Sequence, residues 1–143
     1  MKTLIVITGP TGVGKTELCL RVASTFHIPI INADSRQIFA EIPIGTAAPT
    51  QEQQAEVKHY FVGTLHLGDY YSASNYEQDV LHLLEELFKS SDVALMSGGS
   101  MMYIDAVCKG IDDIPTIRDD IRNEMKKRLE EEGLPTLVEE LHR

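Results

Sequence analysis

Residues 9–16 constrain the fold most, because they read Gly-Pro-Thr-Gly-Val-Gly-Lys-Thr and match the phosphate-binding pattern G-x-x-x-x-G-K-[ST] in full. The pattern functions between a strand and a helix, and both are predicted here. Residues 3–8 are apolar and β-branched, as in a buried parallel strand, and residues 16–26 show helical spacing of apolar side chains. The chain therefore opens with a predicted strand–loop–helix unit. The expected buried face of its helix carries Leu18, Cys19, Val22 and Phe26.

The chemistry of such a loop follows from its residue types. Glycines let consecutive backbone N–H groups point at anionic oxygens, and the helix N-terminus adds partial positive charge. Lys15 supplies a full charge, and the Thr16 hydroxyl is a ligand for Mg²⁺. The alternative is a glycine-rich turn that binds nothing. The predicted phosphate-binding residues are Gly9, Pro10, Thr11, Gly12, Val13, Gly14, Lys15 and Thr16.

Composition indicates one domain, or most of one, with an ordinary core, because 43% of the 143 residues are hydrophobic. The net charge is −9, and residues 61–143 account for all of it. This argues against a general nucleic-acid binder but not against a local contact. No apolar run has transmembrane length, so we expect no membrane association. The two cysteines lack metal spacing and fit buried thiols in a reducing cytoplasm.

Polar residues follow the second predicted strand, residues 28–32. Functional groups gather at the carboxyl ends of strands in open α/β sheets, which places Asp34 near the phosphate loop. Its carboxylate can accept a proton or hold a Mg²⁺-bound water. Arg36 and Gln37 can present paired hydrogen bonds to a phosphate or a base edge. Spacing alone fits equally well a simple cap on the next turn.

A third buried strand is predicted over residues 93–96. Many P-loop NTPases end this strand with an Asp that organises Mg²⁺, whereas this chain has Ser97. Gly98 and Gly99 indicate close backbone approach to a ligand or a neighbouring loop, or else a tight turn without a ligand. Ser100 is expected to begin a helix over residues 101–109 with its hydroxyl facing the site.

The remaining segments give coarser predictions. Residues 38–50 read as a loop, residues 50–57 as a short helix and residues 59–62 as an extended piece. His59 and His66 lack partners at metal-ligand spacing and read as structural or surface residues. Ser74 and Glu77 fit a capping box that starts a helix with a core face of Val80, Leu83, Leu84, Leu87 and Phe88. A highly charged helix is expected over residues 117–132 and another helix over residues 134–143, separated by Gly133.

Together these motifs resemble the N-terminal half of the tRNA dimethylallyltransferases, the isopentenyltransferases that prenylate an adenosine beside the anticodon. The P-loop is shared by many families, but the other matching blocks are more specific and arrive in the family's order over nearly the whole chain. The matching blocks are residues 9–16, Asp34-Ser35-Arg36-Gln37, Ile44-Gly45-Thr46-Ala47, Tyr71-Ser72-Ala73, Gly98-Gly99-Ser100-Met101 and Tyr103.

The resemblance implies an α/β, P-loop NTPase-like three-layer fold with a parallel sheet, incomplete here and followed by helices of an inserted domain. It implies a P-loop core over residues 1–111 and the beginning of a helical tRNA-binding domain over residues 112–143. The implied reaction joins dimethylallyl diphosphate to the exocyclic amine of an adenosine 3′ to the anticodon. Diphosphate is released, with Mg²⁺ as cofactor.

The resemblance also implies residue roles. Residues 12–16 would hold diphosphate and Mg²⁺, with Lys15 and Thr16 as the reacting side chains and Thr16 as the metal ligand. Asp34 would act as general base on the adenine amine. The implied contacts to the tRNA anticodon stem-loop are Asp34, Ser35, Arg36, Gln37, Ser100 and Arg122.

The chain departs from the family in three respects. Ala48 stands where the family commonly has Lys, which removes one positive contact, and Ser100 stands where the family usually has Thr. The family enzymes are also about twice as long. We therefore expect a fragment with little transferase activity of its own and a full-length protein that is monomeric. The alternatives are a small P-loop nucleotide or metabolite kinase, a non-enzymatic nucleotide-binding domain, and a prenyltransferase acting on free adenine nucleotides.

Overall fold

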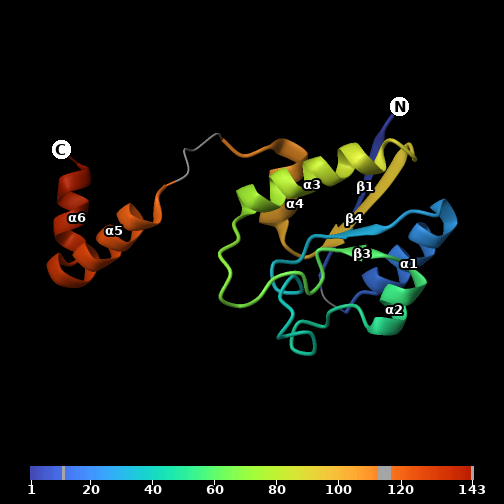
Figure 1. Cartoon of the computed structure of the whole chain (residues 1–143), viewed down its shortest axis with the longest axis horizontal. Coiled ribbons are helices and arrows are strands. Elements are labelled where there is room, and N and C mark those ends of the chain that lie inside the picture. The colour runs from blue at the N-terminus through green and yellow to red at the C-terminus, as the bar shows by residue number, and fades with distance from the viewer. Residues whose placement is uncertain (11, 113–116, 143) are drawn as a thin grey trace. The chain divides into compact units, whose positions relative to one another are not determined.

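The computed structural model describes residues 1–10, 12–112 and 117–142. The chain divides into two compact units, residues 1–111 and 112–143, and each is described by itself (Figure 1). Strands and helices alternate in most of residues 1–111, and the described part of residues 112–143 contains two helices. The elements are β1 (Thr3–Thr8), α1 (Lys15–Phe26), β2 (Ile30–Asn32), α2 (Gln51–Glu56), β3 (His59–Tyr60), α3 (Ala73–Leu87), β4 (Val93–Gly98), α4 (Met101–Lys109), α5 (Asp119–Glu132) and α6 (Leu134–Leu141).

The sheet has four parallel strands in the order β1-β4-β2-β3. β4 pairs with β1 along its whole length, from Thr3 opposite Val93 to Thr8 opposite Gly98. β2 pairs with β4 on one side and with the short β3 on the other. All carboxyl ends therefore meet at one edge, and the loops that follow β1, β2 and β4 are neighbours there. Among the described residues, β1 pairs on one side only.

Helices cover both faces of the sheet, which confirms the predicted three-layer α/β class with a parallel sheet. Side chains alternate along each strand, so Ile30 and Leu95 pack with α1 while Ile31 and Met96 pack with α3 and α4. The α3–α4 side is built around Tyr76, which is fully buried and stacks on Tyr103 with ring centroids 4.2 Å apart. Strands buried on both faces read as continuous apolar runs, which is why residues 93–96 were predictable.

The buried face of α1 differs from the prediction. Cys19, Leu20 and Ala23 are buried, whereas Leu18 and Phe26 are 49% and 50% exposed. The apolar residues of this helix form two overlapping faces, and their spacing alone does not show which face is buried. The observed face presents the small side chains of Cys19 and Ala23, which let the helix axis approach the sheet closely.

The start of α3 also corrects the prediction. Ser72, not Ser74, is the N-cap, because the Ser72 hydroxyl accepts from the Asn75 N–H at 3.2 Å. The Asn75 side chain in turn accepts from the Ser72 N–H at 3.0 Å, which completes a capping box. Asn takes the place of the usual Glu or Gln, so the Ser74–Glu77 pattern was misleading. Tyr76, Val80 and Leu84 form the buried face, with Leu83, Leu87 and Phe88 partly buried beside it.

The other boundaries follow the sequence closely. α4 has the predicted bounds, α2 is capped by Thr50 and Gln53, and β2 is shorter than expected because it begins after Pro29. β4 extends two residues beyond the prediction, to Gly98. Most of the linker predicted over residues 111–116 lies outside the described residues. No helix that the structure describes is long and apolar enough to cross a membrane.

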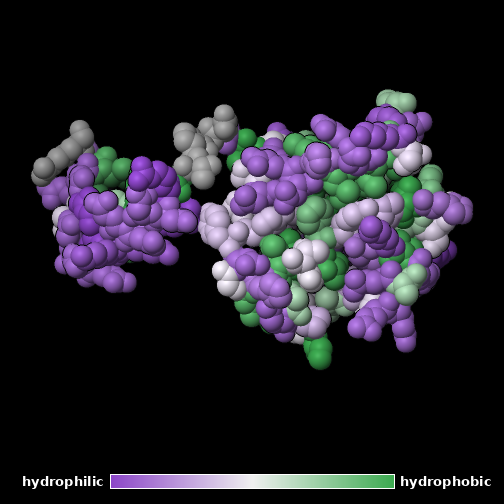
Figure 2. All heavy atoms as spheres, viewed as in Figure 1, coloured by the Kyte–Doolittle hydropathy of each residue, from purple (hydrophilic) through white to green (hydrophobic). Residues whose placement is uncertain are grey.

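In residues 112–143, α5 and α6 form a helical pair with mostly hydrophilic atoms on the face seen in Figure 2. α5 ends at Glu132, and Gly133 follows it as predicted, with φ 81°, a positive value that favours glycine. Arg128 of α5 hydrogen-bonds to Glu132 and also to Glu140 of α6, and this pairing raises its pKa. The apolar side chains of Ile121 and Leu129 are exposed within this unit. Its assignment to tRNA binding stays a prediction.

Candidate functional site

The loop after β1 is shaped as an anion cradle. Gly14 is the N-cap of α1 with φ 87°, a conformation that favours glycine, and no side chain caps this helix end. The first N–H groups of α1 therefore remain for a ligand. The Lys15 side chain folds back over the loop and donates from Nζ to the Pro10 carbonyl at 2.6 Å. Its ammonium is thereby held over the loop.

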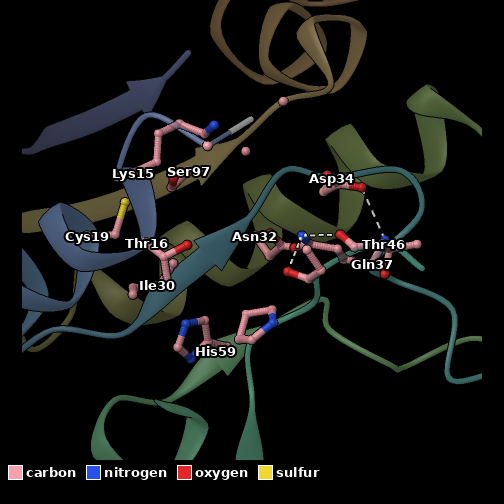
Figure 3. A pocket seen from close by; sticks show the side chains of 16 residues that line it. Lys15, Thr16, Cys19, Ile30, Asn32, Asp34, Gln37, Thr46, His59 and Ser97 are labelled. Atoms are coloured by element: carbon pink, nitrogen blue, oxygen red, sulfur yellow. Dashed lines mark hydrogen bonds between the residues drawn. The ribbon is translucent and has the colours of Figure 1, made fainter. Parts of the chain in front are cut away.

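A cavity of about 380 Å³ lies beside this loop (Figure 3). Lys15, Thr16 and Ser97 lie on one side of it, and Asp34, Gln37 and Thr46 lie on the other. One cation and one carboxylate are therefore brought into the same cavity from separate loops. The described residues that line it are Gly12, Gly14, Lys15, Thr16, Cys19, Ile30, Asn32, Asp34, Gln37, Thr46, Ala47, Pro49, His59, Ser97, Gly98 and Gly99.

Asp34 caps a turn, as one of the two alternatives left open by the sequence expected, and it also lines the cavity; its functional role stays a prediction. Its Oδ1 accepts from the backbone N–H groups of Arg36 at 2.8 Å and Gln37 at 3.1 Å. These bonds fix the orientation of the carboxylate. The second oxygen, Oδ2, has no hydrogen-bond partner among the described residues, and it remains to accept a proton or a metal-bound water.

Gly98 explains how the loops after β2 and β4 come together. A Cβ at Gly98 would lie 2.1 Å from the Ala33 carbonyl oxygen, so the close approach is to the neighbouring loop. The Ala33 N–H donates to the Ser97 carbonyl at 2.7 Å, and the Ser100 N–H donates to the Ala33 carbonyl at 3.0 Å. Gly99 has open space around its Cα and lines the cavity. The backbone just before Asp34 is therefore fixed to β4.

Ser100 serves this same junction. Its hydroxyl accepts from the Ser35 N–H at 2.8 Å and donates to the Ser35 hydroxyl at 3.0 Å. It makes no cap hydrogen bond to α4, and neither serine lines the cavity. The expectation that the Ser100 hydroxyl faces the site is therefore wrong, because Ser35 engages it.

Gln37 joins the turn after β2 to the loop over residues 44–49. Its Nε2 donates to the carbonyls of Thr46 at 3.0 Å and Ala47 at 3.1 Å (Figure 3). Ala47 has φ 51°, an uncommon conformation for alanine that this double contact helps to hold. The Asp-Ser-Arg-Gln and Ile-Gly-Thr-Ala blocks, separate in the sequence, thus form one wall of the cavity.

The lining residues without a predicted functional role include Asn32, His59 and Cys19. Asn32 is buried, and its side-chain amide donates to the Phe61 carbonyl at 3.2 Å. Burial lowers the pKa of His59, partly opposed by its contact with the Val57 carbonyl, and this favours the neutral ring. Burial raises the pKa of the Cys19 thiol, against smaller effects of Ser97 and Lys15. Asn32 could have been predicted, because it lies at the carboxyl end of a strand. His59 reaches the cavity because β3 pairs with β2, and nothing in the sequence indicated that pairing.

The oxygen donors in the cavity suit a hard cation such as Mg²⁺. The Thr16 hydroxyl, the Asp34 carboxylate and the Ser97 hydroxyl all line it, and oxygen is the ligand type that Mg²⁺ prefers. No cluster of three or more His, Cys, Asp or Glu side chains able to hold a metal occurs in the part of the chain that the structure describes. Most ligands would then come from water and substrate, as is usual for Mg²⁺.

Several predicted site residues lie elsewhere. Gly9, Pro10 and Val13 belong to the loop but do not line the cavity, and Thr11 lies outside the described residues. Arg36 is exposed in the turn after Asp34. Arg122 lies in α5, in the second unit. Roles for these residues toward diphosphate or tRNA stay predictions.

Comparison with known proteins gives a consistent result. The family model for IPP transferase matches residues 37–143. The chain is 61% identical over 141 residues to tRNA dimethylallyltransferase 2 of Parabacteroides distasonis, covering 99% of this chain and 47% of that protein. It is 60% identical over 141 residues to tRNA dimethylallyltransferase 1 of Bacteroides thetaiotaomicron, covering 99% of this chain and 46% of that protein. The chain thus spans about half the length of these curated relatives.

Solved structures agree in fold. The full-length tRNA isopentenylpyrophosphate transferase of Bacillus halodurans superposes with a TM-score of 0.75 at 25% identity, covering 99% of this chain and 47% of that one. A eukaryotic dimethylallyltransferase described as acting on tRNA superposes with a TM-score of 0.72 at 25% identity, covering 85% of this chain and 31% of that one.

Proposed function

The chain belongs to the IPP transferase family, and we propose that it supplies the diphosphate site and the proton acceptor for transfer of a dimethylallyl group to tRNA. The observation that carries the proposal is the shared cavity of Lys15 and Asp34. A cation beside backbone N–H groups suits a diphosphate leaving group, and a carboxylate on the facing wall suits an attacking amine. The acceptor is the exocyclic amine of the adenosine 3′ to the anticodon.

The diphosphate end of the reaction lies at the loop before α1. The N–H groups at the start of α1 and the Lys15 ammonium bind the phosphate oxygens. As the allylic C–O bond breaks, its electron pair goes to diphosphate, and these groups stabilise the charge that develops there. The Thr16 hydroxyl and a water held by Asp34 would ligate Mg²⁺, which when bound neutralises further charge on the diphosphate.

The acceptor end lies at the turn after β2. The adenine nitrogen forms a bond to the allylic carbon, and Asp34 Oδ2 takes the proton that the amine loses. Oδ1 stays bonded to Arg36 and Gln37, so the carboxylate keeps its orientation during the transfer. The base must leave its stack to reach the cavity. Exposed Arg36 is placed to contact the RNA backbone nearby.

The other predicted RNA-contacting residues contribute to the reaction less directly than Asp34. Ser35 and Ser100 bond to each other, and Gln37 bonds to the loop over residues 44–49, so these three residues fix the wall that presents Asp34. Arg122 belongs to the second unit, and its contact with tRNA rests on the family alone. Lys15 is the one cation among the described cavity residues, so residues 1–143 alone are expected to bind diphosphate weakly and to transfer little.

The test is dimethylallyl transfer by the full-length gene product that contains this chain. Labelled dimethylallyl diphosphate, Mg²⁺ and an unmodified tRNA would be used with Asp34→Asn and, as a control, Asp112→Asn at an exposed site. In Asp34→Asn the amide oxygen can still accept from the turn but cannot take the proton, so transfer is expected to fall about 10²–10⁴-fold while diphosphate binding persists. Unchanged transfer in Asp34→Asn would contradict the proposal. ATP turnover without prenyl transfer would indicate a kinase instead.

A further inference from the structure

Asn32 is a buried polar residue at the end of β2, and the reaction described so far gives it no role. It is 6% exposed and lines the cavity that also contains Asp34 (Figure 3). A buried amide is compatible with a stable fold when its polar groups have hydrogen-bond partners, because each group left without one costs stability. The partners of the two amide atoms of Asn32 therefore indicate what this side chain can do.

The nitrogen of the Asn32 amide is already occupied. Nδ2 donates to the Phe61 carbonyl at 3.2 Å, and because a carbonyl oxygen can only accept, this bond identifies the nitrogen end of the amide. β3 ends at Tyr60, and Phe61 has φ 63°, a left-handed conformation that is uncommon for a bulky residue. The Asn32 amide thus fastens the chain where it turns away from β2.

The backbone of Asn32 is fixed as well. The hydroxyl of Tyr76, a fully buried residue of α3, donates to the Asn32 carbonyl at 2.8 Å. On the other side, the Ala33 N–H donates to the Ser97 carbonyl at 2.7 Å. With its backbone and its Nδ2 both held, the Asn32 side chain cannot rotate without breaking a hydrogen bond, so its oxygen Oδ1 keeps one direction.

That oxygen faces the cavity. Oδ1 has no hydrogen-bond partner among the described residues, yet no fully buried side-chain nitrogen or oxygen that the structure describes lacks a partner. Oδ1 is therefore accessible, and the cavity is the open space that Asn32 lines. Alternate side chains of an extended segment lie on the same side, and Ile30, Asn32 and Asp34 all line this cavity. An unpaired acceptor and the Asp34 carboxylate thus face the same ligand.

We propose that Asn32 Oδ1 accepts a hydrogen bond from the exocyclic amine of the acceptor adenosine and holds the hydrogen that the amine keeps. The proposal rests on the function proposed above and adds a second contact to the reacting nitrogen. The amine carries two hydrogens. As its nitrogen bonds to the allylic carbon and the C–O electron pair leaves with diphosphate, one hydrogen passes as a proton to Asp34 Oδ2. The other stays on the nitrogen in the product, bonded to Asn32 Oδ1.

This hydrogen bond should be strongest in the transition state. Positive charge develops on the nitrogen as it attacks, and an acceptor that is already fixed in place stabilises that charge. The oxygens of an ionised phosphate offer no hydrogen to Oδ1, so the Asn32 side chain gives the diphosphate no contact. Loss of Oδ1 should therefore slow the transfer and leave diphosphate binding unchanged.

The experiment measures dimethylallyl transfer by the full-length gene product to two anticodon stem-loops, with adenosine or N6-methyladenosine at the acceptor position. The methylated amine has one hydrogen, which Asp34 must take, so Oδ1 gains no partner from it. In Asn32→Ala, kcat/KM should fall about tenfold or more with adenosine and about twofold or less with N6-methyladenosine. The affinities of the two stem-loops, measured with diphosphate bound, give the same comparison if the methylated amine reacts too slowly. Losses of equal size on both substrates would overturn the proposal.

Matched variants separate this contact from a structural effect. Tyr76→Phe removes the hydroxyl that holds the Asn32 backbone but keeps Oδ1, so any loss should be equal on the two substrates. Gln78→Ala removes an exposed amide from α3 and should leave both rates unchanged. Asn32→Val, with a side chain suited to a strand, replaces Asn32→Ala if the alanine variant does not fold.

The diphosphate site provides the remaining distinction. Calorimetric titration of full-length Asn32→Ala with inorganic diphosphate and Mg²⁺ should give the wild-type affinity. An affinity reduced about tenfold would mean that Oδ1 accepts from a metal-bound water, and the proposal would be wrong. Wild-type protein that transfers nothing to the adenosine stem-loop would instead refute the proposed function. Normal transfer by Asn32→Ala on both substrates would refute this contact alone.

Discussion

Gly98 is the position where one methyl group should cost the most stability. In Gly98→Ala the new Cβ would lie 2.1 Å from the Ala33 oxygen, 2.3 Å from its carbonyl carbon and 2.8 Å from its Cα. These are backbone atoms, so no side chain can rotate to make room. Ala33, which follows β2, must move away from β4 by about 1.3 Å or more to reach an ordinary contact of 3.4 Å.

The cost follows from what this displacement disturbs. The hydrogen bonds from Ala33 N–H to Ser97 and from Ser100 N–H to Ala33 both stretch, at about 1 kcal/mol each. Overpacking of a close backbone contact adds about 1–3 kcal/mol. The free energy of unfolding should therefore fall by about 3–5 kcal/mol, a large part of the ~5–15 kcal/mol typical of a domain.

The assay is urea unfolding of the 143-residue chain followed by circular dichroism. With a typical slope of about 1–3 kcal/mol per molar urea, the midpoint should fall by about 1 M or more. Gly99→Ala is the matched control, because no atom lies within 4 Å of its ideal Cβ, and it should stay within ~0.5 kcal/mol of wild type. Equal stability of Gly98→Ala and Gly99→Ala would refute the argument that these two loops are locked by backbone contact.

Three further predictions concern the charge of Lys15, the helix cap at Ser72 and the titration of His59. Lys15→Met should weaken binding of inorganic diphosphate about tenfold or more in calorimetry, since a hydrogen bond to a charged group contributes about 1.5–3 kcal/mol. Ser72→Ala should lower the free energy of unfolding by about 1 kcal/mol, and Ser74→Ala should leave it nearly unchanged, in urea titrations. His59 has a folded pKa below its ordinary value, so its contribution to stability is full above about pH 6.5 and is lost as the pH falls through the folded pKa. His59→Gln should remove that loss in midpoints measured from about pH 5 to about pH 7.5.

Each of these has a contrary result. Diphosphate affinity unchanged in Lys15→Met would mean that the anion binds elsewhere. A larger loss in Ser74→Ala than in Ser72→Ala would restore the capping box that the sequence indicated. A midpoint that depends on pH as steeply in His59→Gln as in wild type would assign the dependence to other groups, such as His66, whose pKa Glu41 raises and whose effect has the opposite sign.

Local signals predicted most of the architecture. The order and type of the elements followed from the sequence because their signals are local. These signals are the loop over residues 9–16, the apolar runs of the strands, and the helix-ending residues Gly110 and Gly133. The buried face of α1 did not follow from the sequence. Leu18 and Leu20 are equally apolar, and only packing against the sheet decides which of them is buried. The predicted cap of α3 was wrong because Asn75 performs a role that the common capping-box pattern gives to Glu or Gln.

The candidate site was predictable where strand ends converge. Asp34, Lys15 and Thr16 line one cavity because β1, β4 and β2 are parallel neighbours, and a strand-to-helix motif already indicates such a sheet. Partnerships across the loops were not predictable, since nothing local links Ser100 to Ser35 or Gln37 to Thr46. Such contacts join residues far apart in the chain, and they decide which polar groups remain available to a ligand.

The position of β1 links the phosphate loop to the free edge of the sheet. This strand carries the loop at its carboxyl end, yet among the described residues only β4 pairs with it, and Leu4, Ile5, Val6 and Ile7 are merely half-buried. An open apolar edge recruits further strands, and each added hydrogen bond would fix the position of β1 more firmly. By thermodynamic reciprocity, an anion whose binding depends on the position of β1 also strengthens that pairing. Diphosphate would then act as a folding ligand for the sheet as well as a leaving group.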